Sequence, residues 1–192
     1  FTLPAGNRPL TSDEVARSRE TLLDDRKRAR TTPGGIIAFE YNETLVDDMT
    51  PEERDRELDS RWHKGGFAFL GAYADLMATH EANHHAAEYA RTEMRKVIEN
   101  PEIADILMPD DHPVGVKRLC LDTGYLETFN ASHVDVVDVR ASPIERITPR
   151  GIVSGGKEYE VDCIVFATGF DAMTGALTSI DIAGRGGVKL KE

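Results

Sequence analysis

The stretch that decides the fold is Cys163-Ile164-Val165-Phe166-Ala167-Thr168-Gly169-Phe170-Asp171 (CIVFATGFD, residues 163–171). Residues 163–167 are apolar at every position, as a strand buried on both faces of a parallel sheet requires. The run closes on Thr168 and Gly169, and an acid follows at Asp171. Open α/β sheets bind ligands beyond the carboxyl ends of their strands, where small residues allow close approach of the backbone. The sequence therefore predicts an α/β fold with a ligand-binding edge after residue 167.

The residues on either side of this run predict further strands. A β-meander is expected at 144–147, 151–154 and 158–161, with turns at Pro149-Arg150 and Gly155-Gly156. An earlier short strand is predicted from Val134, Val136, Val137 and Val139. The tail, 180–190, has short apolar stretches between glycines and no evident partner in the chain.

Residues 11–109 predict successive helices. Thr11 with Glu14 forms a capping-box start for a helix running toward Thr31, before Pro33-Gly34-Gly35. Thr50-Pro51-Glu52-Glu53 starts a helix to about His63, because Thr can cap and Pro suits the first helical position. Apolar side chains at three- and four-residue spacing then predict core stripes. They are Phe69, Leu70, Tyr73, Leu76 and Met77, followed by Ala87, Ala90, Met94, Val97 and Ile98.

Charge and composition exclude several classes of function. The 192 residues carry a formal net charge of −11, which disfavours nucleic acid and anionic membranes as partners. No apolar run approaches the ~20 residues that span a bilayer, and residues 1–4 lack the features of a signal peptide. Cys120 and Cys163 stand in apolar surroundings and are expected to be buried free thiols in a reducing compartment, hence the cytoplasm. The chain reads like a segment of something larger.

His80-Glu81-Ala82-Asn83-His84 fits the H-E-x-x-H pattern of zinc hydrolases. Zinc binding needs both histidines inside one helix, yet Thr79, Glu81 and Asn83 are residue types that open helices. The pattern is therefore expected to straddle a helix start, with solvent-exposed histidines and no metal.

Lys117-Arg118 are adjacent cations in an acidic chain, before the apolar run 119–121. On an extended segment they point in opposite directions and serve different partners. In a cleft, Arg offers a planar fork to an anion and Lys a compact charge to a phosphate, whereas on a surface both would simply be solvated. The sequence contains no G-x-G-x-x-G fingerprint, so it predicts an incomplete dinucleotide-binding unit.

Several separated motifs together resemble the Baeyer–Villiger monooxygenases, a family of flavoproteins. They are DCIVFATGFDAMTGAL (162–177), KRLCLDTGYLETFN (117–130), FTLPAGNRPL (1–10), WHKGG (62–66) and IDIAGRGGVKL (180–190). The resemblance covers essentially the whole chain and places it as an internal segment, about the middle third of such an enzyme. It implies an FAD enzyme that uses NADPH and dioxygen to convert ketones to esters or lactones. The rest of the same polypeptide is then a required partner, and the 192 residues alone are expected to be catalytically inactive.

The resemblance also implies domains and site residues. The implied fold is an incomplete Rossmann-like domain with a large α-helical insertion and a β-meander. Residues 1–10 end the first part of the NADPH domain, and residues 11–113 form the insertion. Residues 114–169 form the second part of the NADPH domain, with the β-meander, and residues 170–192 return toward the FAD domain. Arg118 is implied to be catalytic, stabilising the anionic oxygenated flavin, and Lys117 to bind the 2′-phosphate of NADPH. The implied cofactor-binding residues are Lys117, Arg118, Ala167, Thr168, Gly169, Phe170 and Asp171. Leu126 departs from the family, whose members often have Tyr there.

Three other interpretations stay open at this point. The first is a related N- or S-oxygenating flavin monooxygenase, which shares the Ala-Thr-Gly type of strand. The second is a zinc hydrolase that uses His80, Glu81 and His84. The third is a non-catalytic helical interaction module.

Overall fold

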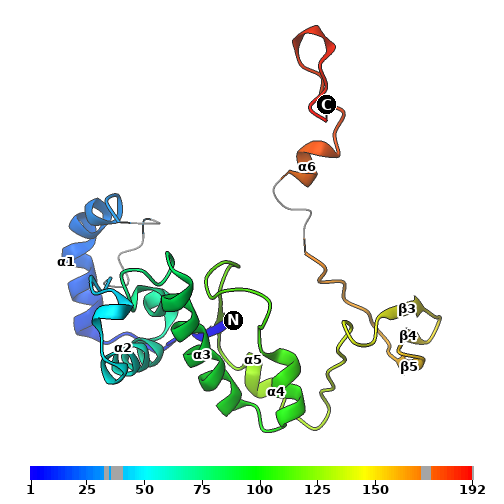
Figure 1. Cartoon of the computed structure of the whole chain (residues 1–192), viewed down its shortest axis with the longest axis horizontal. Coiled ribbons are helices and arrows are strands. Elements are labelled where there is room, and N and C mark those ends of the chain that lie inside the picture. Colours follow the sequence, from blue (N-terminus) through cyan, green and yellow to red (C-terminus); the bar gives the residue numbers. More distant parts are fainter. Residues whose placement is uncertain (33–34, 36–40, 170–173, 192) are drawn as a thin grey trace. The chain divides into compact units, whose positions relative to one another are not determined.

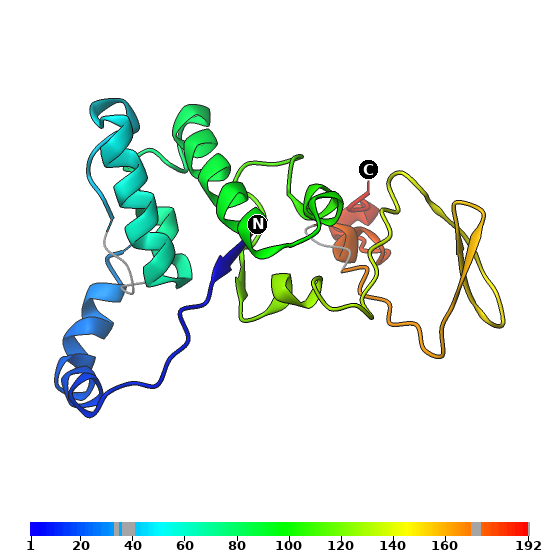
Figure 2. The same ribbon diagram turned by 90° about the horizontal axis from the view of Figure 1, so that it is seen from below.

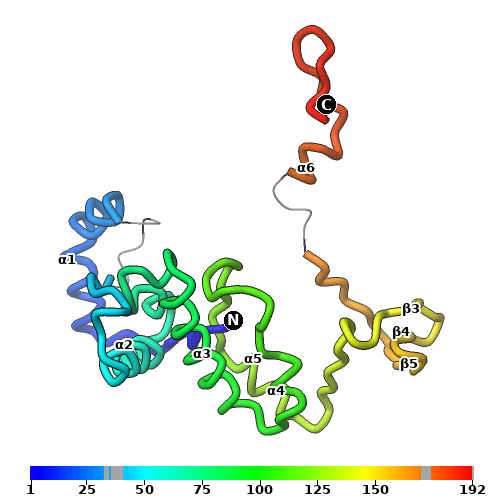
Figure 3. The backbone as a smooth tube through the Cα atoms, in the orientation of Figure 1, coloured from blue at the N-terminus to red at the C-terminus, as the bar shows by residue number. Residues whose placement is uncertain are grey.

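The computed structural model describes residues 1–32, 35, 41–169 and 174–191. The chain divides into two compact units, Phe1–Val136 and Val137–Glu192, and each is described by itself. Figures 1 and 3 let the reader follow the chain through both units from its blue N-terminus to its red C-terminus.

The first unit is mostly helical and contains one parallel strand pair. Its elements are β1 (Thr2–Pro4), α1 (Ser12–Ala29), the 3-10 helix η2 (Val46–Asp48), α2 (Pro51–Lys64), the 3-10 helix η3 (Gly66–Gly71), α3 (His80–Val97), α4 (Pro101–Leu107), β2 (Cys120–Asp122) and α5 (Tyr125–Thr128). Figures 1 and 2 show α2 (cyan) beside α3 (green). The aromatic rings of Trp62, Phe69 and Tyr89 meet between α2, η3 and α3, with 5.5 Å between the ring centroids of Trp62 and Phe69.

Both capping boxes predicted from the sequence are confirmed. At α1, Thr11 Oγ1 accepts a hydrogen bond from the N–H of Glu14, whose carboxylate accepts one from the N–H of Thr11. Thr50 and Glu53 form the same reciprocal pair at α2, where Pro51 occupies the first helical position. These motifs are local in sequence, so the residues alone specify them. The helices end at Ala29 and Lys64, close to the predicted ends.

The core prediction is confirmed for most of the apolar stripes, but residues 66–79 are not a regular helix. Phe69, Tyr73 and Leu76 are buried, as predicted, while they lie on η3 and the turns that follow it. Gly65 and Gly66 have φ values of 76° and 66°, which end α2 and let only a 3-10 turn begin. Met77 is 56% exposed, so its assignment to the core was wrong.

The second unit contains the predicted meander. Its elements are β3 (Ile144–Ile147), β4 (Gly151–Ser154), β5 (Lys157–Glu160), α6 (Gly175–Thr178) and the 3-10 helix η4 (Arg185–Gly187). The antiparallel order is β3-β4-β5, with β4 in the centre and Val153 and Ser154 buried. Gly155 and Gly156 have φ values of 57° and 76°, as the tight turn between β4 and β5 requires.

Two predicted strands are wrong for this chain. Residues 134–138 have no regular secondary structure and Val139 lies in a turn, and residues 163–167 are not in a strand either. Val165 and Phe166 are 84% and 70% exposed, so the run that was predicted to be a buried strand is exposed to solvent. A strand exists only where a neighbour supplies hydrogen bonds, and among the described residues the only parallel pairing is β1 with β2, in the other unit.

Both cysteines are free, but neither is buried, so that prediction was wrong. Cys120 lies on β2, whose only partner among the described residues is β1, and Cys163 lies in the uncovered run just described. Among the described residues, no helix combines the length and apolar character needed to cross a membrane.

Candidate functional site

The parallel pair β1–β2 carries the candidate site. Thr2, Leu3 and Pro4 pair in register with Cys120, Leu121 and Asp122. The N–H of Ala5 donates to the C=O of Asp122 at 3.0 Å, which extends the pairing past the end of β1. Since the strands are parallel, their carboxyl ends lie at one edge, the edge where α/β sheets bind ligands.

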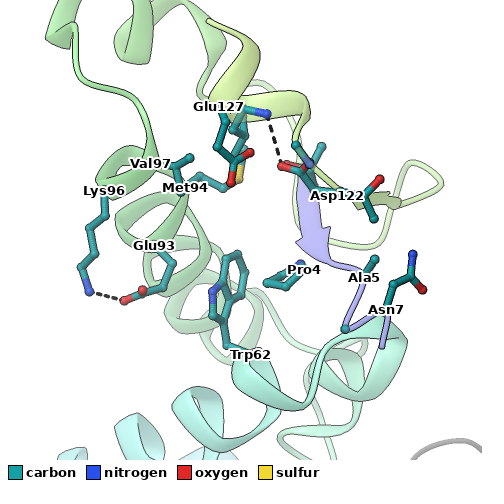
Figure 4. A pocket seen from close by; sticks show the side chains of 15 residues that line it. Pro4, Ala5, Asn7, Trp62, Glu93, Met94, Lys96, Val97, Asp122 and Glu127 are labelled. Atoms are coloured by element: carbon teal, nitrogen blue, oxygen red, sulfur yellow. Dashed lines mark hydrogen bonds and ion pairs between the residues drawn. The ribbon is translucent and has the colours of Figure 1, made fainter. Parts of the chain in front are cut away.

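A cavity of about 660 Å³ opens at this edge (Figure 4). Its walls come from the loops after β1 and β2 and from α2, α3 and α5. They are Thr2, Pro4, Ala5, Gly6, Asn7, Trp62, Glu93, Met94, Lys96, Val97, Asp122, Thr123, Gly124, Leu126 and Glu127. Figure 4 shows the indole of Trp62 next to Pro4, and the ion pair between Glu93 and Lys96. The volume is in the range of small-molecule sites.

Asp122 ends β2 and holds the loop that follows. Its Oδ1 accepts hydrogen bonds from the backbone N–H of Gly124 at 2.8 Å and of Tyr125 at 2.6 Å. Gly124 has a φ of 108°, a conformation that side-chain-bearing residues rarely adopt. The carboxylate thus fixes the start of α5 and shapes the cavity wall, and its oxygen is already occupied by backbone donors.

The loop after β1 is fixed by a contact between two glycines. A Cβ built on Gly65 would lie 2.8 Å from both Cα and N of Gly6 and 2.9 Å from the carbonyl oxygen of Pro4. A Cβ built on Gly6 would lie 2.8 Å from the carbonyl oxygen of Lys64. The WHKGG segment therefore brings the end of α2 against the end of β1, where only glycine fits.

Lys117 and Arg118 lie just before β2, at the opposite end of that strand from the cavity. Both are exposed. Lys117 Nζ is 3.4 Å from Oδ2 of Asp111, and Oδ1 of the same carboxylate accepts a hydrogen bond from Nδ1 of His112 at 2.5 Å. The hydrogen bond from His112, then the one from Lys117, lower the pKa of Asp111 to about 2. Within the described ranges, the Arg118 guanidinium forms no hydrogen bond or ion pair.

The other predicted site residues lie in the second unit. Ala167, Thr168 and Gly169 are exposed, and Gly169 has a φ of 83°. Phe170 and Asp171 lie outside the described residues. The structure therefore describes Lys117 and Arg118 together at one strand, and 167–169 as a separate exposed segment.

The H-E-x-x-H pattern lies wholly inside α3, at its first residues, so the prediction that it straddles a helix start was wrong, whereas the predicted exposure of the two histidines is confirmed. Thr79 caps α3 by accepting from the N–H of Ala82, and His80 is the first helical residue. His80, Glu81 and His84 are exposed. In the part of the chain that the structure describes, no group of three or more His, Cys, Asp or Glu side chains could hold a metal ion.

The sequence reasoning missed the cavity at β1 and β2. Asn7, Trp62 and Asp122 lie within sequence motifs that gave no reason to place them in one site. A usable signal was present, because Asp122-Thr123-Gly124 follows an apolar run as a capping turn follows a buried strand. The three-residue β1 gave no such signal, since it shows no alternation.

Comparison with known proteins gives a consistent picture. The chain is 38% identical over its whole length to an acetone monooxygenase (methyl acetate-forming) from Gordonia sp. (strain TY-5), of which it covers 36%. It is 32% identical over its whole length to a Baeyer–Villiger monooxygenase from Pseudooceanicola batsensis, of which it covers 35%. A crystal structure of OTEMO in complex with FAD and NADP matches with a TM-score of 0.90 and 32% identity, over 98% of this chain and 36% of that one. No protein-family model matches the chain.

A parallel strand pair with a cavity at its carboxyl edge, joined by helices, is the arrangement of an α/β ligand-binding protein, consistent with a partial Rossmann-like unit. The similarity over the full chain makes the class more specific. The chain belongs to the Baeyer–Villiger monooxygenase family, and it spans about a third of the length of the curated relatives it matches.

Proposed function

We propose that this chain is part of an NADPH-dependent FAD monooxygenase that converts ketones to esters or lactones with dioxygen. The relatives named as ketone monooxygenases support this activity, among them a cyclopentanone 1,2-monooxygenase that is 36% identical over the whole chain. The observation that carries the proposal is Arg118, a guanidinium beside β2 that has no partner among the described residues. An unpaired, exposed cation in a chain of net charge −11 is suited to an anionic ligand.

The residues present fit the two cofactors in part. The cavity of about 660 Å³ at the ends of β1 and β2 suits a portion of a dinucleotide. Lys117 is exposed and is held only by a 3.4 Å ion pair with Asp111, so its ammonium can bind a phosphate. The Gly-rich phosphate loops of both nucleotide sites are absent from this sequence, and their contacts would come from the remainder of the polypeptide.

In this proposal each residue acts through its charge or its backbone. FAD, when bound and reduced by NADPH, supplies the oxygen-transfer chemistry. Arg118 donates hydrogen bonds from a planar fork to negative charge beside the flavin, because fixed charge aimed at the reacting atoms is a large catalytic effect. Lys117 contacts the 2′-phosphate of NADPH and gives up Asp111 to do so. Ala167, Thr168, Gly169, Phe170 and Asp171 are the other residues that we propose for cofactor binding.

The domain plan and location belong to the same proposal. Residues 1–10 and 114–169 are two parts of the NADPH domain, 11–113 are its helical insertion, and 170–192 lead to the FAD domain. The acidic chain disfavours nucleic acid and anionic membrane as partners. Two exposed free cysteines support a cytoplasmic location, where thiols stay reduced.

The experiment replaces Arg118 in the full-length enzyme that carries this chain. We expect Arg118→Ala to lower ester or lactone formation by about 10²–10³-fold while NADPH still reduces the flavin, as for loss of one charge-stabilising donor. Ester yield by gas chromatography and flavin absorbance in anaerobic stopped flow separate the two steps. Arg17→Ala is the control, since Arg17 is exposed on α1. Unchanged product formation by Arg118→Ala would contradict the proposal.

One relative supports a second candidate function. A phenazine N-monooxygenase from Lysobacter antibioticus is 32% identical over the whole chain and is covered to 35%. To decide between the two functions, one enzyme preparation is given both an aromatic amine and a cyclic ketone. Only an N-oxygenating enzyme would give the N-oxide as its main product.

A further inference from the structure

The carboxamide of Asn83 is a buried polar group in the first unit that uses all of its hydrogen-bonding atoms. Asn83 lies on α3 and is 6% exposed. Its Oδ1 accepts from the N–H of Val114 at 2.9 Å, and its Nδ2 donates to the carbonyl oxygens of Val114 at 2.9 Å and Leu76 at 3.2 Å. Both N–H donors and the carbonyl oxygen of the amide are therefore used.

These bonds fix the chain three residues before Lys117. Val114 is fully buried, and its backbone N–H and C=O both pair with the one amide, as they would with a neighbouring strand. Gly115 follows with a φ of 86°, and a Cβ built on it would lie 2.8 Å from Sδ of Met77. The backbone thus leaves the core in one defined direction.

The two cations depend on this anchor because little else holds them. Lys117 has one exposed ion pair, of the kind that contributes little, and Arg118 has no hydrogen bond or ion pair among the described residues. On their carboxyl side, Leu119 is 8% exposed and Cys120 pairs with Thr2. Lys117 and Arg118 therefore lie on a short backbone segment that is fixed at one end by Val114 and at the other end by β2.

We infer that Asn83 is a positioning residue for Lys117 and Arg118, and so determines how well the protein distinguishes a 2′-phosphorylated nucleotide from one without that phosphate. This rests on the proposed function, in which Lys117 binds the 2′-phosphate. A misplacement of about 1 Å can cost ~10²-fold in a positioned interaction. A buried amide 34 residues away in sequence from the charge it serves is thereby given a role in cofactor choice.

The test compares the binding of 2′,5′-ADP and 5′-AMP to the full-length FAD-loaded enzyme by calorimetry. Asn83→Leu keeps the approximate volume and removes all the amide hydrogen bonds. We expect it to lower the ratio of the affinity for 2′,5′-ADP to the affinity for 5′-AMP about ten- to hundredfold. The stability control is Leu58→Ala, a buried α2 residue outside the hydrogen bonds to 113–118. Its loss of folded protein affects both probes equally and leaves the ratio unchanged.

A double-mutant cycle with Lys117→Ala shows whether Asn83 acts through that lysine. We expect Lys117→Ala to lower the ratio, and Asn83→Leu to lower it no further in that background. A full additional loss in the double variant would overturn the inference. So would an unchanged ratio in Asn83→Leu when Lys117→Ala does lower it, which would leave the proposed function intact. An unchanged ratio in Lys117→Ala would overturn both.

A second variant covers the case in which Asn83→Leu fails to fold. Gly115→Ala disturbs the same turn from its other side, where the obstructing atom is the flexible end of Met77. We expect the same fall in the probe ratio, and an unchanged ratio would refute the positioning role.

Discussion

Gly65→Ala tests the close backbone contact that shapes the cavity at the end of β1. The substituted Cβ would lie 2.8 Å from Cα and N of Gly6 and 2.9 Å from the carbonyl oxygen of Pro4. All three obstructing atoms are backbone, so no side chain can swing away. Gly65 also has φ 76° and ψ 179°, a region that is essentially restricted to glycine.

The expected loss follows from two separate costs. Backbone strain in this region costs about 1–3 kcal/mol. Forcing an extra carbon into packed surroundings costs a further ~1–3 kcal/mol. We therefore expect Gly65→Ala to lower the free energy of unfolding by about 2–6 kcal/mol. Gly66 is the matched control, because its φ is 66° and a Cβ there would meet no atom within 4 Å. Gly66→Ala should cost only the left-handed strain, about 1–2 kcal/mol.

Urea unfolding followed by fluorescence measures both variants. Trp62, the one tryptophan of the chain, is 9% exposed and lies three residues from Gly65. Linear extrapolation gives each free energy of unfolding, and the difference between the variants isolates the contact with Gly6. If Gly65→Ala and Gly66→Ala are equally stable, the close contact has no energetic weight and the reasoning fails.

Two further predictions concern the helix starts. Thr50→Ala should lower the free energy of unfolding by about 1 kcal/mol, because α2 buries Leu58 and Trp62. Thr11→Ala should lower the helix content measured by circular dichroism but leave the urea midpoint unchanged, because α1 buries no residue. Equal midpoint shifts in the two variants would contradict this. Hydrogen bonds from Arg8, then from Thr11, lower the pKa of Glu14 to about 2, so its stabilising contribution is present above its ordinary pKa of 4.5 and is lost as the pH falls toward 2. Carboxyl NMR titration should find this low pKa and a higher one in Arg8→Ala; an ordinary pKa in the unsubstituted chain would refute the pairing.

The helix starts and the meander could be predicted because their causes are local. A capping box needs only two residues that are three positions apart. Thr11 and Thr50 each have a Glu at that spacing, so their capping boxes do not depend on the fold of the rest of the chain. The turn at Gly155-Gly156 likewise specifies the register of β4 with β5. Core side chains were also predicted correctly at Phe69 and Tyr73, although their local structure is not helical. Burial thus followed from spacing even where the helix did not.

The parallel strands could not be predicted in the same way, because their pairing is remote. Thr2 pairs with Cys120 across more than a hundred residues, and neither segment shows a strand period. The opposite error occurred at residues 163–167, where a strongly apolar run predicted a buried strand. Hydrophobicity indicates that such a run must be covered, but it does not say by which segment. Val165 and Phe166 are exposed here because no described strand pairs with their segment.

The same distinction applies to the candidate site. Two adjacent cations in an acidic chain made Lys117 and Arg118 candidate site residues, whereas the path of the backbone that carries them depends on residues far away in the sequence. The backbone of Val114 is fixed by the amide of Asn83 on α3. The start of β2 is fixed by its pairing with β1, which is remote in the sequence. Anchors of this kind connect the helical residues 11–113 to a charge pair outside them. In the proposed enzyme we therefore expect substitution of Asn83, which acts through Val114, to alter cofactor choice without contact between Asn83 and the cofactor.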